Sequence, residues 1–271
     1  MRRAHSRWLA DEVLPVPATI QELRRPPHTP TAADLQRLYE TRFTGKSAYR
    51  QAVWQVLCPF FSRWISPEDV VLDLGCGWCE FINAVRCGQK FAMDLNPDAE
   101  NHAAPEVNLL RQDCSATWQL PDGSLDAVFS SNFFEHLPNK DALESAFLEA
   151  YRTLKPGGRF IAMGPNVKYV PGACWDFIDH HVPLTELSVL ELMRKCGFEE
   201  EFCRDRFLPY TMSQGQQYPT WMLRTYLALP FAWRFWGKQF LVVGQKKNGS
   251  IRANRANLDS KERTETPAQR S

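Results

Sequence analysis

The sequence has neither an excess of charge of one sign nor a long apolar run. It contains 32 lysines and arginines against 31 aspartates and glutamates, interspersed along 271 residues. Because a protein that binds a nucleic-acid backbone needs concentrated positive charge, we expect no nucleic acid among its partners. No stretch approaches the ~20 apolar residues that cross a bilayer, and no apolar core of a signal segment follows the first arginines. We therefore expect a cytoplasmic protein.

The sequence also lacks cysteines at metal-binding spacing. Its eight cysteines are scattered, and the Cys-x-x-Cys pair of Cys76 and Cys79 stands without the second pair that a zinc site requires. Scattered cysteines in a chain without a secretory signal indicate a reducing compartment. We predict no metal at this pair.

A pattern of strand, turn and helix does stand out, from Val70 to Phe81. The aliphatic run at its start is typical of a strand buried on both faces. Gly75 and Gly77 then allow a tight turn close to a ligand, and from Cys79 the apolar residues follow helical spacing. A helix N-terminus behind such a turn offers unpaired N–H groups. The pattern therefore predicts a nucleotide-like ligand.

The residue at position 80 bears on which nucleotide binds. A dinucleotide fingerprint requires a small residue three positions after the second glycine, and this chain has Glu80 there. A nicotinamide cofactor is therefore disfavoured, although an oxidoreductase remains an alternative.

An acidic residue ends the second predicted strand, Lys90 to Asp94. Asp94 lies nineteen positions after Gly75, close to the ~20-residue spacing at which an acidic residue meets ribose hydroxyls. The alternative is that Asp94 caps the helix beginning near Pro97, a place that Asn96 fills better. We favour the ribose contact.

Several motifs, in the right order, resemble the class I S-adenosylmethionine-dependent methyltransferases, in particular those of type 11. Asp73 and the turn from Gly75 to Trp78 resemble their motif I, with Cys79 in place of the usual third glycine, where its side chain could narrow the cofactor space. The run Leu154 to Phe160 is a further hallmark, in which Lys-Pro-Gly-Gly ends a helix and starts a strand. The resemblance covers Val70 to Phe207 and a closing strand.

This resemblance implies an α/β fold, namely a seven-stranded Rossmann-like sheet flanked by helices, with S-adenosyl-L-methionine as cofactor. It also implies that Asp113, after a third strand from Glu106 to Leu110, accepts a hydrogen bond from the adenine amine, and that the next backbone N–H meets the ring. The residues expected to bind the cofactor are Asp73, Gly75, Cys76, Gly77, Asp94, Leu95, Asp113, Cys114, Ser130 and Asn132.

Three histidines are candidates for catalysis: His136, His180 and His181. The last two lie beside Asp179 in a loop after the fifth predicted strand, and could supply a general base for an acceptor hydroxyl. His136 follows Glu135, and because neighbours on a helix point about 100° apart, these two side chains are not expected to face one spot. Two alternatives stay open: hydrogen bonds fasten the loop to the sheet, or the histidines hold a metal.

The remaining chain divides by composition. Residues 1–30, rich in proline and arginine, are expected to form a flexible arm, and residues 31–66 two helices, with a kink at Pro59 in the second. Residues 67–246 are expected to form the methyltransferase domain, and the polar tail 247–271 to be disordered. Helices before the glycine turn often cover the cofactor in this family, so Arg42 or Tyr49 could reach it.

An insertion of about thirty residues, Leu208 to Lys238, replaces the short hairpin that the family has between its last two strands. It is rich in tyrosine, tryptophan and phenylalanine. Loops of this length in a compact domain usually serve a function. Three interpretations remain open: a helical hairpin packed on the sheet, an acceptor wall, or a peripheral membrane contact through residues 221–236.

A longer pattern looks like a bacterial subgroup associated with glycan assembly. It runs from Asn132 to Leu137, through Asp179, His180 and His181, to Phe207 and Thr211. That resemblance implies O-methylation of a sugar, a lipid-linked glycan or another small-molecule acceptor. The alternative is a protein that binds S-adenosylmethionine without turnover.

Overall fold

The computed structural model describes residues 36–37, 41, 47–210 and 217–247. The expected arm of residues 1–30, Arg42 and the tail beyond residue 247 lie outside the described residues. Of the first predicted N-terminal helix, Gln36, Arg37 and Thr41 are described, and all three are helical.

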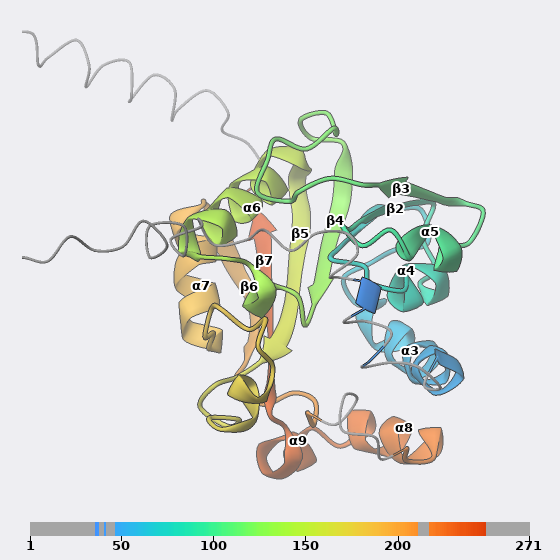
Figure 1. Ribbon diagram of the computed structural model, residues 1–271, viewed down its shortest axis with the longest axis vertical. Coiled ribbons are helices and arrows are strands. Elements are labelled where there is room, and N and C mark those ends of the chain that lie inside the picture. Colours follow the sequence, from blue (N-terminus) through green and yellow to red (C-terminus); the bar gives the residue numbers. More distant parts are fainter. Residues whose placement is uncertain (1–35, 38–40, 42–46, 211–216, 248–271) are drawn as a thin grey trace, which may run out of the picture.

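The centre of the molecule is a seven-stranded sheet in the order β3-β2-β1-β4-β5-β7-β6 (Figure 1). Neighbours among β1 to β5 pair in parallel, whereas β7 runs antiparallel to both β5 and β6. The strands are β1 Val70–Leu74, β2 Gln89–Met93, β3 Val107–Leu110, β4 Leu125–Ser131, β5 Leu154–Pro165, β6 Phe198–Arg204 and β7 Gln239–Lys246. The predicted fold, a Rossmann-like methyltransferase sheet, is confirmed.

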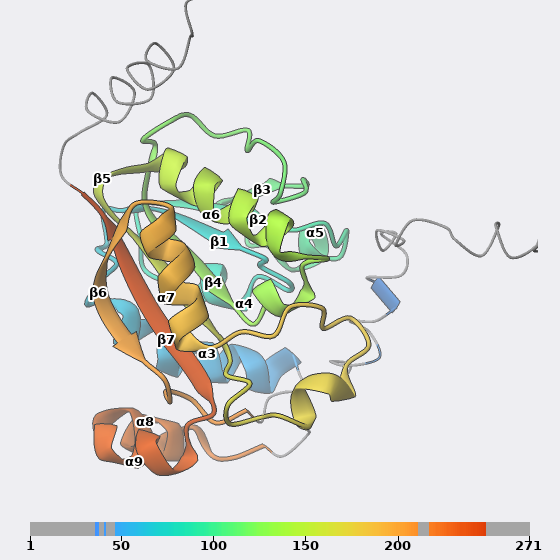
Figure 2. The same cartoon turned by 90° about the vertical axis from the view of Figure 1, so that its left-hand side faces the viewer.

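Helices cover both faces of the sheet (Figure 2). One core lies between the sheet and α6 and α7, and a second lies between the sheet and α3 and α4. The α-helices are α3 Ser47–Phe61, α4 Glu80–Ala84, α5 Ala99–His102, α6 Lys140–Thr153, α7 Glu186–Lys195, α8 Thr220–Ala228 and α9 Pro230–Trp236. Two 3-10 turns complete the order, η1 Phe134–His136 and η2 Ala173–Asp176.

The helices on the first face begin where side chains satisfy their N–H groups. The Asn139 side chain accepts a hydrogen bond from the Ala142 N–H at the start of α6. Thr185 and Ser188 form a reciprocal capping box at the start of α7. These caps fix α6 and α7 across the strands that carry the site.

The strand β7 completes the sheet by lying between β5 and β6, which both precede it in sequence. Its last residue, Lys246, donates hydrogen bonds to the carbonyl oxygens of Tyr151 (2.6 Å) and Leu154 (2.7 Å), where α6 ends. Burial lowers the pKa of this amine. The last described strand therefore also supplies the cation that binds the C-terminal carbonyls of α6.

Two predicted boundaries differ in the structure. The fifth strand, expected over Arg159 to Met163, already starts at Leu154, which pairs with Leu125. Arg159 then pairs with Ala127, so the Pro-Gly-Gly segment between them is an irregularity within β5 instead of a separate turn. The insertion, left open in the sequence, forms the two short helices α8 and α9.

Among the described residues, no helix combines the length and apolar character needed to cross a membrane. The cytoplasmic location stays a prediction.

Candidate functional site

The glycine turn ties the ends of β1 and β2 together. The Gly75 N–H donates to the Met93 carbonyl oxygen at 2.9 Å. The Gly77 N–H donates to one carboxylate oxygen of Asp94 at 2.8 Å, and the Asn96 N–H donates to the other at 2.8 Å. Asp94 therefore does not cap the following helix: its carboxylate holds the turn in shape beside the end of β2.

Both glycines of the turn are required by its backbone. Gly75 and Gly77 have φ values of +73° and +53°, in the left-handed region. A Cβ on Gly75 would lie 2.1 Å from Cγ of Phe133, the second residue after β4. Phe133 thus packs directly on the turn, and no larger residue fits at position 75.

Cys79 also adopts the left-handed conformation, with φ of +60°. Its side chain is fully buried, with its sulfur 3.7 Å from that of Cys76 and 3.8 Å from the Ala99 carbonyl oxygen. A side chain lining an open cofactor site would have exposed surface. The Cys79 side chain, which could have narrowed the cofactor space, is therefore not part of an open cofactor site. A cysteine at position 79 instead costs backbone strain.

Three carboxylates gather under the turn. Asp73 and Glu80 are buried, and Glu80 forms a two-pronged ion pair with Arg50 of α3, with N–O distances of 2.5 and 3.1 Å. Burial raises the pKa of Asp73 well above its ordinary value, and repulsion from Glu80 and Asp94 adds to this. Burial likewise raises the pKa of Asp94. Such a region favours a positively charged ligand.

The end of β3 supplies the next predicted contacts. Asp113 is exposed, and its carboxylate accepts hydrogen bonds from the Ser115 N–H (2.8 Å) and hydroxyl (2.7 Å). Cys114 is buried, which raises the pKa of its thiol to about 12 and leaves it unreactive. Leu95, after β2, is exposed. These residues lie at the carboxyl ends of parallel strands, where ligands bind in open α/β sheets.

The end of β4 is more buried than the sequence indicates. The Ser130 side chain has no exposed surface, and its hydroxyl donates to the Leu74 carbonyl oxygen at 2.8 Å. Asn132 is half-buried with φ of +51°, and its amide donates to the Ser131 hydroxyl. The hydroxyl of Ser130 therefore joins β4 to β1, while Asn132 shapes the turn toward Phe133.

Opposite the turn, a loop from η2 lies against η1. His136 Nδ1 lies 2.9 Å from the Asp179 carboxylate, so Asp179 pairs with a histidine from η1 across the two loops. The backbone N–H groups of His181 and Val182 both donate to the Glu135 carbonyl oxygen, at 2.7 and 3.2 Å. These contacts fasten the loop to η1, the 3-10 turn that follows β4.

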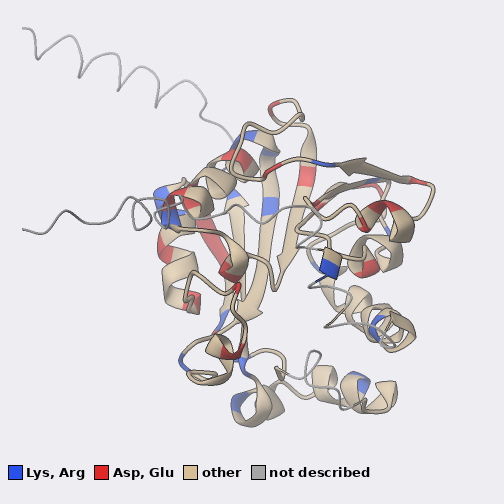
Figure 3. Ribbon diagram, viewed as in Figure 1, with Lys and Arg blue, Asp and Glu red and all other residues tan. Residues whose placement is uncertain are grey.

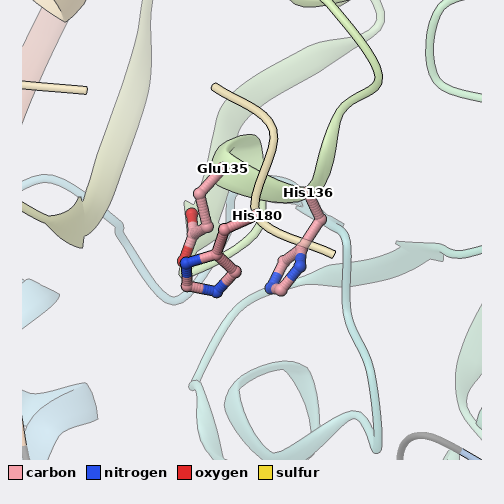
Figure 4. A group of neighbouring side chains, drawn as sticks. All are labelled: Glu135, His136 and His180. Atoms are coloured by element: carbon pink, nitrogen blue, oxygen red, sulfur yellow. The ribbon is translucent and has the colours of Figure 1, made fainter. Parts of the chain in front are cut away.

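Glu135, His136 and His180 lie together, as Figure 4 shows. Each offers one atom of metal-ligand type, and the three atoms lie within 4.8 Å of one another. The expectation that Glu135 and His136 cannot face one spot is therefore wrong. His180, buried between them from the other loop, approaches both side chains, with its ring 4.7 Å from that of His136. The chemistry of these three side chains suits a metal ion, which the sequence left open as one alternative for the histidines.

The third candidate histidine differs from the other two. The His181 side chain is exposed, whereas His180 is buried and stacks on Phe177 with 5.0 Å between ring centroids. The sequence singled out these histidines but not Phe133 or Arg50, which no spacing connects to the turn. The two adjacent histidines thus lie in different environments, in a part of the loop that has no regular secondary structure.

Comparisons with known proteins agree with this geometry. Residues 72–162 match the family described as methyltransferase domain. A protein of Encephalitozoon cuniculi named as a methyltransferase is 32% identical over 130 residues, 47% of this chain and 60% of its own length. A protein of Mycolicibacterium smegmatis named as an S-adenosylmethionine-dependent methyltransferase is 29% identical over 137 residues, 48% of this chain and 52% of its own.

Solved structures agree on the fold. A SAM-dependent methyltransferase from Archaeoglobus fulgidus has a TM-score of 0.58 at 19% identity, covering 78% of this chain and 99% of its own. A chain from the complex between the Haloferax volcanii Trm112 methyltransferase activator and a methyltransferase has the same TM-score and identity, covering 80% of this chain and 99% of its own. The matched region spans about three fifths of the Encephalitozoon cuniculi relative and about half of the Mycolicibacterium smegmatis relative.

Proposed function

We propose that this chain is an S-adenosylmethionine-dependent methyltransferase. The observation that carries the proposal is the Asp94 carboxylate bound to the Gly77 N–H, because it joins a glycine turn and a strand-end acid in the arrangement that holds a nucleoside. The match of residues 72–162 to a methyltransferase domain supports it.

On the donor side, this chain offers groups of suitable chemistry. Asp94 retains lone pairs for ribose hydroxyls beyond its backbone donors, and Asp113 is an exposed acceptor for an adenine amine. A cationic donor would relieve the repulsion that Asp73 experiences from Glu80 and Asp94. When bound, S-adenosylmethionine would supply a methyl carbon that carries its own leaving group.

On the acceptor side, we assign the wall to η1 and the loop that follows η2. With a built-in leaving group, positioning supplies most of the rate, and a base has only to receive the acceptor's proton. His181, which is exposed, is our candidate for this base; His136 and His180 shape the wall. We infer an oxygen acceptor on a sugar, a lipid-linked glycan or another small molecule, in line with the resemblance to glycan-assembly enzymes.

Calorimetric titration with S-adenosylmethionine, S-adenosylhomocysteine and NAD tests the cofactor. We expect binding of the first two alone. Asp94→Ala should weaken binding by about 1.5–3 kcal/mol, the value of a hydrogen bond to a charged acceptor. Asp141→Ala, at an exposed acid on α6, is the matched control and should bind normally. Binding of NAD alone would favour an oxidoreductase instead.

An acceptor screen with labelled methyl donor tests turnover. In His181→Ala we expect a lower kcat with unchanged donor affinity and a shifted pH profile. Donor binding without any acceptor-dependent product across sugars and lipid-linked sugars would favour a non-catalytic binding protein. Equal activity of His181→Ala and wild type would refute the assignment of the base.

A further inference from the structure

The helices α8 and α9 carry a large apolar surface that faces solvent. No residue of α8 is buried, and α9 buries Ala232 and Trp233 alone. The exposed large side chains, between 39% and 68% exposed, are Trp221, Met222, Leu229, Phe231, Phe235 and Trp236. We call these six residues the apolar patch. Exposed aromatic and aliphatic side chains gathered on two neighbouring helices are typical of an interaction surface.

The inner side of the same helices is firmly held. Leu223, Tyr226 and Leu227 pack against the core beneath α3. The Tyr226 hydroxyl donates to the Phe207 carbonyl oxygen at 2.6 Å, and Trp233 Nε1 donates to the Tyr226 carbonyl oxygen at 2.9 Å. The inner side chains of α8 and α9 therefore pack on the core, and the apolar patch lies on the outer side of these anchored helices.

The charge around the apolar patch has one sign. Residues 217–238 contain Arg224, Arg234 and Lys238 but no aspartate or glutamate, in a chain whose charges otherwise balance. All three side chains are exposed. Figure 3 shows Lys and Arg, and no Asp or Glu, on α8 and α9. Basic residues beside exposed tryptophan and phenylalanine form the combination that binds anionic lipid surfaces.

The apolar patch lies at the end of the molecule that holds the site. Parallel strands β4 and β5 point toward α8 and α9, and the loop of η2 lies at the same end (Figures 1 and 2). That loop adds two exposed apolar side chains, Trp175 and Ile178, close in sequence to His181. A surface that the apolar patch touches would therefore lie at the same end as the acceptor wall.

We propose that α8 and α9 dock this protein on an anionic lipid bilayer, with the apolar patch in the headgroup region and the carboxyl ends of the strands turned toward the membrane. A second copy of the chain is a poorer occupant, because a two-fold contact would bring the same three cations against each other. Docking does not depend on methyl transfer. That the acceptor is anchored in lipid follows from docking, and this part rests on the proposed function.

Co-sedimentation of the full chain with vesicles tests docking. We expect binding to phosphatidylcholine vesicles that contain phosphatidylglycerol, weaker binding to pure phosphatidylcholine, and weakening by salt. Phe231→Ser with Trp236→Ser should reduce binding by about tenfold or more. The matched control is Leu148→Ser with Leu187→Ser, at exposed leucines on α6 and α7 outside the apolar patch, which should bind as wild type.

A second readout locates the contact. The fluorescence of a Trp236→Phe variant should be quenched less by lipids carrying a shallow spin label than that of wild type. Arg224→Glu with Arg234→Glu should remove the preference for anionic lipid.

Three outcomes would overturn docking: no binding to anionic vesicles, equal binding by the apolar-patch variant and its leucine control, or self-association in sedimentation velocity that the apolar-patch variant abolishes while vesicle binding is absent. S-adenosylhomocysteine titration of each variant separates the two proposals. Vesicle binding without cofactor binding would contradict the proposed function and leave docking intact, whereas the reverse would contradict docking alone.

Discussion

At the scale of single residues, the glycine turn is limited by its backbone and by one neighbour. Gly75 needs the left-handed conformation, and Phe133 occupies the space where a Cβ would stand. Sequence spacing can predict the first requirement but not the second, because Phe133 is brought there by the pairing of β1 with β4.

Gly75→Ala should therefore destabilise the protein by about 2–5 kcal/mol, combining left-handed strain with overpacking. Urea unfolding measures this cost. In a Phe133→Ala background the same change should cost about 1–3 kcal/mol less, since the overpacking disappears. Equal costs in both backgrounds would show that the two side chains do not compete for space.

Asp73 gives a prediction that depends on pH. Its pKa is raised in the folded chain above the ordinary 3.8 by burial, then by Glu80 and Asp94. As the pH rises above 3.8, the unfolded chain loses this proton before the folded chain does. The native state then binds more protons than the unfolded state, so stability falls as the pH rises toward the raised pKa. Asp73→Asn removes this loss.

The stability of Asp73→Asn relative to wild type should therefore increase as the pH rises above about 4, as measured by urea unfolding at each pH. Binding of a cationic donor should weaken in the same variant. A stability difference independent of pH would indicate that Asp73 has an ordinary pKa.

At the scale of elements, α3 is joined to the helix after the turn by an ion pair between two residues that lie thirty positions apart in sequence. Arg50 and Glu80 are both largely buried, whereas Arg194 and Glu200 form an exposed pair between α7 and β6. A second link joins α3 to the insertion, where the Tyr218 N–H donates to the Tyr49 hydroxyl at 3.1 Å. Tyr49, which the sequence offered as a cofactor contact, has this structural role.

Arg50→Ala should cost about 3–5 kcal/mol, because it leaves a buried carboxylate without its partner. The control Arg194→Ala should cost less than about 1 kcal/mol. Adding Glu80→Gln to Arg50→Ala should recover part of the loss. Thermal unfolding of the four proteins tests this, and similar losses in both single variants would contradict the contrast in burial.

How far the elements can be predicted depends on what decides each one. Apolar runs and glycine or proline punctuation place β1 and β2 within about a residue of the expected ends. The aromatic insertion could not be assigned, because aromatic residues suit a core and a lipid surface equally. Likewise Asp94 was found by spacing, while the partner of Asp179 depends on how two loops meet.

At the scale of the whole molecule, cofactor binding should raise stability. A ligand that binds the folded chain alone, at a hundred times its Kd, adds about 2.7 kcal/mol. For a chain of this size that corresponds to a Tm increase of about 5–10 °C. S-adenosylhomocysteine should give this shift in thermal unfolding, NAD should give none, and Asp94→Ala should give a smaller one at the same ligand concentration. A shift as large with NAD would contradict the cofactor assignment.

The position of β7 has a consequence for how the protein is made. β7 is the last described strand in sequence, yet it lies between β5 and β6 and binds the end of α6 through Lys246. A nascent chain leaving the ribosome therefore presents β5 with an unpaired apolar edge, and β6 with no neighbour, until residues 239–246 emerge. A chain that stops before Gln239 would lack the strand that joins β5 to β6, and its sheet would keep an open edge that invites aggregation.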